Sequence, residues 1–296
     1  MNFKKVMSVG LVSVLSLGML VGCGSKTSAD TSSKKGSDAS GTKKTASQDL
    51  SGAVATNGST SMESVIGNLS EQFMQDNPNV KVTYDATGSG TGIESVAAGS
   101  CDIGLASRAL KDEEKAKNLE EKTIALDGIA IIVNKDSKLS DISLDDVTKI
   151  YTGAVSNWKD VGGDDAEIAA IGREAGSGTR DGFESITGTK DACKYSQELT
   201  STGAVIEAVK NSPNAIGYAS FSAVEGQDGI KALTVNGVEC TEDNISNGKY
   251  VIQRPFNLIT LKGKDLSTQA KAFFDYASSK DASKLIEKAG AVPTAK

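Results

Sequence analysis

The stretch from Ala170 to Phe183, AIGREAGSGTRDGF, places one arginine three residues ahead of a turn made of glycine and hydroxyl residues. A helix is expected to follow this turn, and a helix N-terminus offers unpaired backbone N–H groups and the positive end of a dipole. The guanidinium of Arg173 adds a planar pair of donors suited to two oxygens. Together with Ser and Thr hydroxyls, these groups indicate a site for a tetrahedral oxyanion.

Two further turns of the same kind occur earlier in the chain, at Gly58 to Ser61 and at Gly88 to Gly92. A single Gly/Ser turn is ordinary turn chemistry, because glycine supplies unusual backbone angles and serine bonds its own backbone. Three such turns, each after an expected strand, are less easily explained in that way. We therefore expect them to contribute to one anion site.

The sequence excludes several kinds of catalysis. The chain has no histidine, which removes Ser-His-Asp and Cys-His mechanisms and the usual zinc sites. The run GREAGSGTR lacks the lysine of a nucleotide-hydrolysing P-loop, and GSGTRD does not match the dinucleotide fingerprint. Ser246 to Lys249 fits S-x-x-K, but it lies in an expected loop and chance explains it better. We predict a binding protein that is not an enzyme and needs no metal or cofactor.

Hydrophobic periodicity predicts the elements that carry these turns. Strands are expected at Gly52 to Thr56 and at Val80 to Tyr84, with a helix between them that stops at Asn77 and Pro78. Two long apolar runs, Ile124 to Asn134 and Val251 to Thr260, are expected to be buried strands. The repeated order of strand, turn and helix is typical of an α/β sheet that binds ligands at the carboxyl ends of its strands.

The N-terminal residues have the features of an export signal. Lys4 and Lys5 precede an apolar run that ends in LVGC, Leu20 to Cys23, which matches a bacterial lipobox. An ordinary signal peptide with a chance cysteine is the alternative. We predict a signal peptide over 1–22, a lipidated Cys23 and a flexible tether over 23–49, since this Ser/Thr/Lys-rich segment cannot bury a core. No later run is long enough to span a bilayer.

The net charge limits the kinds of ligand the protein can bind, and the cysteines limit its possible disulfides. The formal net charge of the whole chain is −6. Lys4 and Lys5 contribute +2, and the tether, with five lysines and three aspartates, contributes another +2, so the chain beyond the tether has a net charge of −10. An acidic surface argues against nucleic acid, so an anionic ligand needs local donors. Beyond Cys23, the chain has Cys101, Cys193 and Cys240. A Cys193–Cys240 bridge and three free buried thiols are equally consistent with the sequence.

Six short motifs, taken in order, resemble those of PstS-type solute-binding proteins, the phosphate-binding lipoproteins of a phosphate ABC importer. The motifs are GSTS at Gly58, TGSGTG at Thr87, CDIGLASR at Cys101, DGIAIIVN at Asp127, REAGSGTR at Arg173 and AIGYAS at Ala215. The resemblance covers nearly all of the chain after the tether. It implies an α/β, two-lobed type II periplasmic-binding-protein fold, in which each lobe is a mixed sheet flanked by helices.

The same resemblance implies how the chain is divided. The two long strands would be the crossovers that join the lobes. The first lobe would comprise residues 50–126 and 255–296, and the second lobe residues 127–254. Because donors then come from both lobes, the ligand would draw the lobes together.

The family pattern, transferred residue by residue, also implies the phosphate site. Thr60 and Ser61 would donate from the first helix N-terminus, and Ser89 from the second turn. Arg173 would be the charged clamp, and hydroxyls and amides of the second lobe would come from Ser177, Gly178 and Thr179.

Two positions depart from the family pattern. Some relatives place an aspartate after the third motif, where it accepts the proton of hydrogen phosphate, whereas Ser107 stands here, followed by Arg108. Ser107 can donate or accept a hydrogen bond, and Asp127 is our substitute candidate for the proton acceptor. Ala175 stands where some relatives carry an acid that pairs with the arginine. Glu174 would take over that pairing, or Arg173 would be held less firmly.

The predicted function is an extracytoplasmic, lipid-anchored, monomeric receptor that binds inorganic phosphate and delivers it to the membrane subunits of an ABC permease. A receptor for sulfate, molybdate or another oxyanion is the alternative within this fold. A surface lipoprotein for adhesion or sensing is the alternative from another class, and a hydrolase is the remote third.

Overall fold

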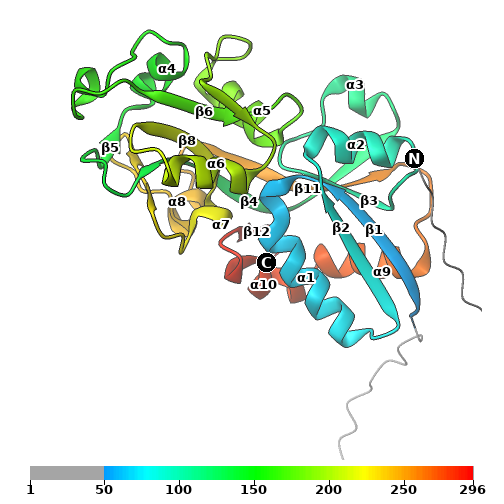
Figure 1. The fold of residues 1–296 in the computed structure, drawn as a ribbon. Helices are drawn as coiled ribbons and strands as arrows, with labels where there is room; N and C mark the ends of the chain where they lie inside the picture. Colours follow the sequence, from blue (N-terminus) through cyan, green and yellow to red (C-terminus); the bar gives the residue numbers. More distant parts are fainter. Residues whose placement is uncertain (1–49, 296) are drawn as a thin grey trace, which may run out of the picture. The chain divides into compact units, whose positions relative to one another are not determined.

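The structure, a computed structural model, describes residues 50–295. The predicted signal peptide (1–22), the predicted lipidation site Cys23 and the whole predicted tether (23–49) lie outside these residues. Figure 1 shows two groups of helices and strands, connected by the long strands β4 and β11. We call the group that contains β1 the first lobe and the group that contains β8 the second lobe.

The first lobe begins with the predicted alternation of strands and helices. Its strands in chain order are β1 (Gly52–Gly58), β2 (Val80–Ala86), β3 (Ile103–Ala106) and β12 (Val292–Pro293). Its helices are η1 (Thr60–Met62), α1 (Glu63–Asp76), α2 (Ser89–Ala97), α3 (Asp112–Lys115), α9 (Thr268–Ala277), η3 (Lys280–Ala282) and α10 (Ser283–Lys288).

The second lobe repeats this alternation. Its strands are β5 (Asp141–Ile142), β6 (Ala169–Arg173), β7 (Gln197–Leu199), β8 (Ala215–Ser220), β9 (Ile230–Ala232) and β10 (Thr234–Val235). Its helices are α4 (Leu144–Tyr151), η2 (Trp158–Val161), α5 (Gly178–Thr187), α6 (Thr202–Lys210), α7 (Phe221–Val224) and α8 (Glu242–Ser246).

Strands β4 (Leu119–Asn134) and β11 (Gln253–Leu261) belong to one mixed sheet with the order β2-β1-β3-β11-β4-β8-β6-β7. They pair antiparallel, and Asp127 lies opposite Arg254 in their register. The first half of β4 pairs with β11, and the second half pairs with β8. The sheet therefore passes from one lobe to the other through these two strands.

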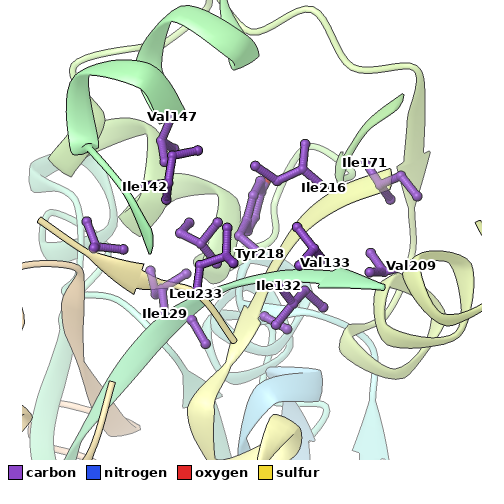
Figure 2. Close-up of a cluster of buried hydrophobic side chains, with 14 of the residues drawn as sticks. Ile129, Ile132, Val133, Ile142, Val147, Ile171, Val209, Ile216, Tyr218 and Leu233 are labelled. Carbon is purple, nitrogen blue, oxygen red and sulfur yellow. The ribbon is translucent and has the colours of Figure 1, made fainter. Parts of the chain in front are cut away.

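Each lobe has its own hydrophobic core. In the second lobe, Figure 2 shows side chains from β4, β6, β8, α4 and α6 meeting around Tyr218. In the first lobe, the core joins α1, α9 and α10 to strands β1, β3 and β11. Residues of the first core precede Asp127 or follow Arg254, and those of the second core lie between them. The lobe boundaries at 126/127 and 254/255 stay a prediction.

Several predicted elements are longer or shorter than expected. The predicted strand at Ile124 begins earlier, at Leu119. The strand predicted at Val251 to Thr260 spans Gln253 to Leu261 instead. The turn at Gly88 to Gly92 is the first turn of α2, because its helix starts at Ser89. This last difference matters for the site, since it places the Ser89 hydroxyl directly at a helix N-terminus.

The cysteines in the described region are all free. Cys240 is buried and Cys101 and Cys193 are partly buried, so the Cys193–Cys240 bridge is absent and only one of the three thiols is fully buried. Burial raises the pKa of the Cys101 thiol to about 11. Over residues 50–295, no helix combines the length and the apolar character needed to cross a membrane.

Candidate anion site between the lobes

Four helix N-termini meet where the two lobes touch. The first lobe supplies η1, which leads into α1, and α2; the second lobe supplies α5 and α6. Ser59, Ser177 and Ser201 cap three of them, because each side chain accepts a backbone N–H of the first turn. The positive ends of four helix dipoles therefore face the same place, which favours an anion there.

A network of hydroxyl groups connects the lobes at these N-termini. The Ser61 hydroxyl lies 2.8 Å from that of Thr179 and 3.0 Å from that of Thr202. The Thr60 hydroxyl lies 3.1 Å from that of Thr202 and also accepts the Thr202 backbone N–H at 3.2 Å. All four side chains are buried. Each of these contacts pairs a group of the first lobe with one of the second.

A second set of hydroxyls surrounds Ser107, which follows strand β3. Ser59 donates to the Ser107 hydroxyl at 2.8 Å, and the Ser89 hydroxyl lies 3.2 Å from it. The Ser89 hydroxyl also accepts the backbone N–H of Ser107 at 3.0 Å. These side chains are buried too. Ser107 is thus fixed beside the N-termini of η1 and α2.

The close approach of these segments requires glycine at two places. A Cβ atom at Gly178 would lie 2.3 Å from the Ser89 hydroxyl and 2.6 Å from that of Ser107, so any larger residue would separate α5 from the first lobe. Gly58 has a φ of +144°, and a Cβ there would meet the Leu105 carbonyl at 2.1 Å. Beside them, the backbone N–H of Gly90 donates across the lobes to the Gly176 carbonyl at 2.9 Å.

Arg173 is the cation of this site, and it lies at the end of β6 with only 1 % of its surface exposed. Its Nε donates to the Leu199 carbonyl and its Nη2 to the Thr200 carbonyl, both at 3.0 Å. Its Nη1 lies 3.3 Å from the Thr202 hydroxyl. Because a guanidinium has five N–H donors, one on each Nη nitrogen stays available. Backbone carbonyls thus hold Arg173 in place, although Ala175 provides no acidic side chain to pair with it.

No carboxylate within residues 50–295 forms an ion pair with Arg173, and Glu174 does not take over that role. Burial lowers the pKa of Arg173 to about 10, and the nearby Arg254 contributes to the shift. The guanidinium is still charged at neutral pH. A buried charge without a partner is costly, so an anion bound here would stabilise the protein.

Asp127 belongs to β4, lies opposite Arg254 of β11 and is completely buried. Its Oδ2 accepts from Arg254 Nε at 3.3 Å and Nη2 at 3.0 Å. Its Oδ1 accepts from the Ser220 hydroxyl at 2.8 Å and the Ser222 backbone N–H at 3.3 Å. Burial raises the pKa of Asp127, and attraction to Arg254 opposes that rise. These bonds occupy the carboxylate's four acceptor positions.

The structure brings the predicted site residues together at one place. Thr60, Ser61, Ser89, Ser107, Arg173, Ser177, Gly178 and Thr179 all lie buried at the four helix N-termini. Arg108 does not face the hydroxyls; it pairs with Glu114 at 2.7 Å and contacts Asp181 of the second lobe at 2.7 Å. Its Nε–H is not aligned on that Asp181 oxygen, so the second contact is an ion pair without a well-formed hydrogen bond.

Sequence reasoning missed Ser59, Thr202 and Arg254. Ser59 belongs to the first turn, and its N-cap position next to Thr60 could have marked it. Thr202 begins helix α6 and follows Thr200 and Ser201, a cluster of capping residues that could have marked it. Arg254 sits within an apolar strand, and only its register opposite Asp127 shows its role.

Pockets open on two sides of this site. One, of about 590 Å³, is lined by residues of both lobes, including Arg108, Gly176 and Arg254. The other, of about 370 Å³, reaches Thr60, Ser61 and Thr202. Its lining also includes three glutamates, Glu63, Glu207 and Glu225. In the described part of the chain, no cluster of three His, Cys, Asp or Glu residues is arranged to hold a metal ion.

Comparison with known proteins reveals relatives over most of the chain. Residues 37–281 match the model of the PBP superfamily domain. The phosphate-binding protein PstS of Bacillus subtilis is 35% identical over 240 residues, which cover 80% of this chain and 78% of that protein.

Two solved structures are similar in fold and sequence. A candidate phosphate ABC transporter substrate-binding protein from Clostridium perfringens, solved with bound phosphate, has a TM-score of 0.78 and is 38% identical; the match covers 82% of this chain and 100% of that one. An ABC-type phosphate transport receptor from Vibrio cholerae has a TM-score of 0.67 and is 32% identical, with 81% and 99% covered.

Proposed function

The chain belongs to the PBP superfamily and, within it, to the PstS phosphate-binding proteins, and from that premise we propose that it captures inorganic phosphate for an ABC importer. The ligand is bound and released without covalent change. The site lies where the two lobes meet, and its donors are the hydroxyls and amides of four helix N-termini together with Arg173.

One observation carries this proposal: Arg173 is a fully buried cation that no carboxylate of the described chain neutralises. Two of its N–H groups remain available beside the hydroxyls of Thr202, Ser61 and Thr179. A tetrahedral dianion would satisfy both the charge and the hydroxyls at once. A neutral ligand would leave the charge uncompensated.

Ligand binding would favour the arrangement in which the lobes touch. Ser61 and Thr60 come from the first lobe, and Thr179, Thr202 and Arg173 from the second. An anion that contacts both sets gains its full complement of bonds only when the lobes are together. This difference in affinity gives the permease two states to distinguish.

The proposal extends to location. We propose that the protein acts outside the cytoplasm as a monomer, tethered by a lipid on Cys23. Replacement of Cys23 by serine should move the protein from the membrane fraction to the medium. Membrane retention of that variant would contradict the lipid anchor and leave the phosphate site untouched.

Calorimetric titration with phosphate, sulfate and molybdate tests the function. We expect one phosphate per chain and much weaker binding of the other two anions. Tighter binding of sulfate or molybdate would assign the receptor to another oxyanion. Absence of heat from all three would contradict oxyanion capture altogether.

A further inference from the structure

The hydrogen-bond partners of Ser107 determine which way its hydroxyl points. A hydroxyl has one proton to donate and two lone pairs to accept with. Arg254 Nη1 donates to the Ser107 oxygen at 3.1 Å, and the Ser59 hydroxyl donates to it at 2.8 Å. Both lone pairs are therefore occupied. The Ser107 hydroxyl can then only donate, either to the Ser89 hydroxyl, 3.2 Å away, or to a bound anion.

Arg254 is in turn held by the opposite strand. Its Nε and Nη2 both donate to Asp127 Oδ2, and Ser220 and Ser222 hold the other carboxylate oxygen. Arg254 and Asp127 are directly opposite in the β4–β11 register, and both are buried. A guanidinium always carries protons on its nitrogens and accepts no hydrogen bond, so the donor that faces Ser107 cannot change its role.

We propose that Arg254, positioned by Asp127, holds Ser107 as a hydrogen-bond donor, so that the Ser107 oxygen cannot accept a hydrogen bond from the proton of a bound anion. Both residues are positioning residues rather than ligand contacts. The inference rests on the proposed function, since it concerns how that site distinguishes phosphate from other oxyanions. It also assigns Asp127 to Arg254 rather than to the ligand's proton.

This arrangement has a consequence for selectivity. Hydrogen phosphate carries a proton that needs an acceptor, whereas sulfate carries none. A Ser107 hydroxyl that can only donate interacts equally well with an unprotonated oxygen of either ion. If the Arg254 donor were removed, the Ser107 oxygen would have a lone pair free and could accept the phosphate proton.

The experiment is a set of calorimetric titrations of the full-length chain with phosphate and with sulfate, at mildly alkaline pH where phosphate is the hydrogen phosphate dianion. Because Arg254→Met alone would leave Asp127 buried without its partner, the test variant combines Arg254→Met with Asp127→Asn. We expect its ratio of phosphate affinity to sulfate affinity to exceed the wild-type ratio about tenfold, the effect of one hydrogen bond to a charged ligand.

Two matched variants show whether a rise in the affinity ratio comes from the Ser107 hydroxyl or from a general change in the structure. Asp127→Asn alone keeps the Arg254 donor on Ser107, so its ratio should equal that of the wild type even if both affinities fall. Addition of Ser107→Ala to the double variant removes the hydroxyl, and the gain in the ratio should disappear. Thermal unfolding of each variant shows whether it is folded.

The outcomes are distinguishable. An unchanged ratio in the folded double variant, or an equal rise in Asp127→Asn alone, would overturn the proposed role of Arg254 and leave the phosphate receptor intact. Wild-type protein that binds neither anion would overturn both the receptor and this inference. If the higher affinity ratio persists after Ser107→Ala, a group other than Ser107 accepts the phosphate proton, and the inference is wrong.

Discussion

Arg173 determines the electrostatics of the site because its charge is buried and no carboxylate of residues 50–295 forms an ion pair with it. Its carbonyl partners, Leu199 and Thr200, fix the plane of the guanidinium without cancelling its charge. The Arg254 charge nearby is already balanced by Asp127. The site therefore has one net positive charge to offer a ligand, inside a protein of net charge −6.

Replacement of Arg173 by alanine should weaken phosphate binding by about 2 to 5 kcal/mol, the cost of deleting one partner of a buried charged contact. This corresponds to a loss of roughly thirtyfold or more in affinity. Titration calorimetry measures it, with Lys271→Ala as the control, because Lys271 is an exposed residue of α9 that pairs with Asp275. Unchanged affinity in Arg173→Ala would mean that the clamp is another residue.

The contribution of the Thr202 hydroxyl to phosphate binding can be tested directly, although the sequence alone did not identify this residue. Thr202→Val keeps the shape of the side chain and removes the hydroxyl that contacts Thr60, Ser61 and Arg173. We expect phosphate affinity to fall about tenfold, as for one hydrogen bond to a charged group. Thr202→Ser keeps the hydroxyl and should bind nearly as tightly as the wild type. Equal affinities for the Val and Ser variants would remove Thr202 from the site.

At the scale of elements, the site depends on how closely α5 approaches the first lobe. The backbone at Gly178 lies against the hydroxyls of Ser89 and Ser107, and Gly90 bonds the Gly176 carbonyl next to it. The N-termini of α2 and α5, one from each lobe, are thereby brought to the same place. Packing at this contact is as important as the donors themselves.

Gly178→Ala should oppose contact between the lobes, because its Cβ would lie 2.3 Å from the Ser89 hydroxyl. We expect a loss of phosphate affinity of at least tenfold with little change in thermal stability, measured by calorimetry and unfolding. Gly203→Ala is the matched control, since it lies in the first turn of α6 and its Cβ would meet nothing within 4 Å. A similar loss in both variants would argue against the steric explanation.

Ion pairs between the β3–α3 connection and α5 form a second contact between the lobes. Asp181 contacts Arg108 at 2.7 Å and Lys111 at 3.1 Å, and it is partly exposed. Asp181→Asn should speed phosphate dissociation by about two- to fivefold, since partly exposed pairs contribute little. Stopped-flow measurement detects this change, and Asp275→Asn in the exposed pair of α9 serves as the control. No change in dissociation would show that this pair does not hold the lobes together.

The order of elements was predictable from the sequence because apolar periodicity and capping residues are local signals. Helix α1 ends at Asp76, just before the predicted stop at Asn77 and Pro78, and β1 and β2 begin at the predicted Gly52 and Val80. The pairing of Asp127 with Arg254 was not predictable, since it depends on the register of two strands far apart in the chain. The hydroxyl network between Ser61, Thr179 and Thr202 likewise exists only once both lobes are in place.

At the scale of the whole molecule, both lobes contribute residues to the one proposed site. Strands β4 and β11 carry the sheet from one lobe to the other (Figure 1). Their Asp127–Arg254 pair lies next to Ser107, because Arg254 donates to the Ser107 hydroxyl. The connection between the lobes is thus adjacent to the proposed binding groups. A ligand between the lobes would be coupled directly to their arrangement.

A crystal structure of the protein with phosphate tests the central claim most directly. The account predicts one phosphate bound to both Nη atoms of Arg173, to the hydroxyls of Ser61, Thr179 and Thr202, and to the amides of the adjoining helix N-termini. A phosphate bound outside this cluster, for example in the pocket beside Arg108, with Arg173 making no contact to it, would contradict the account.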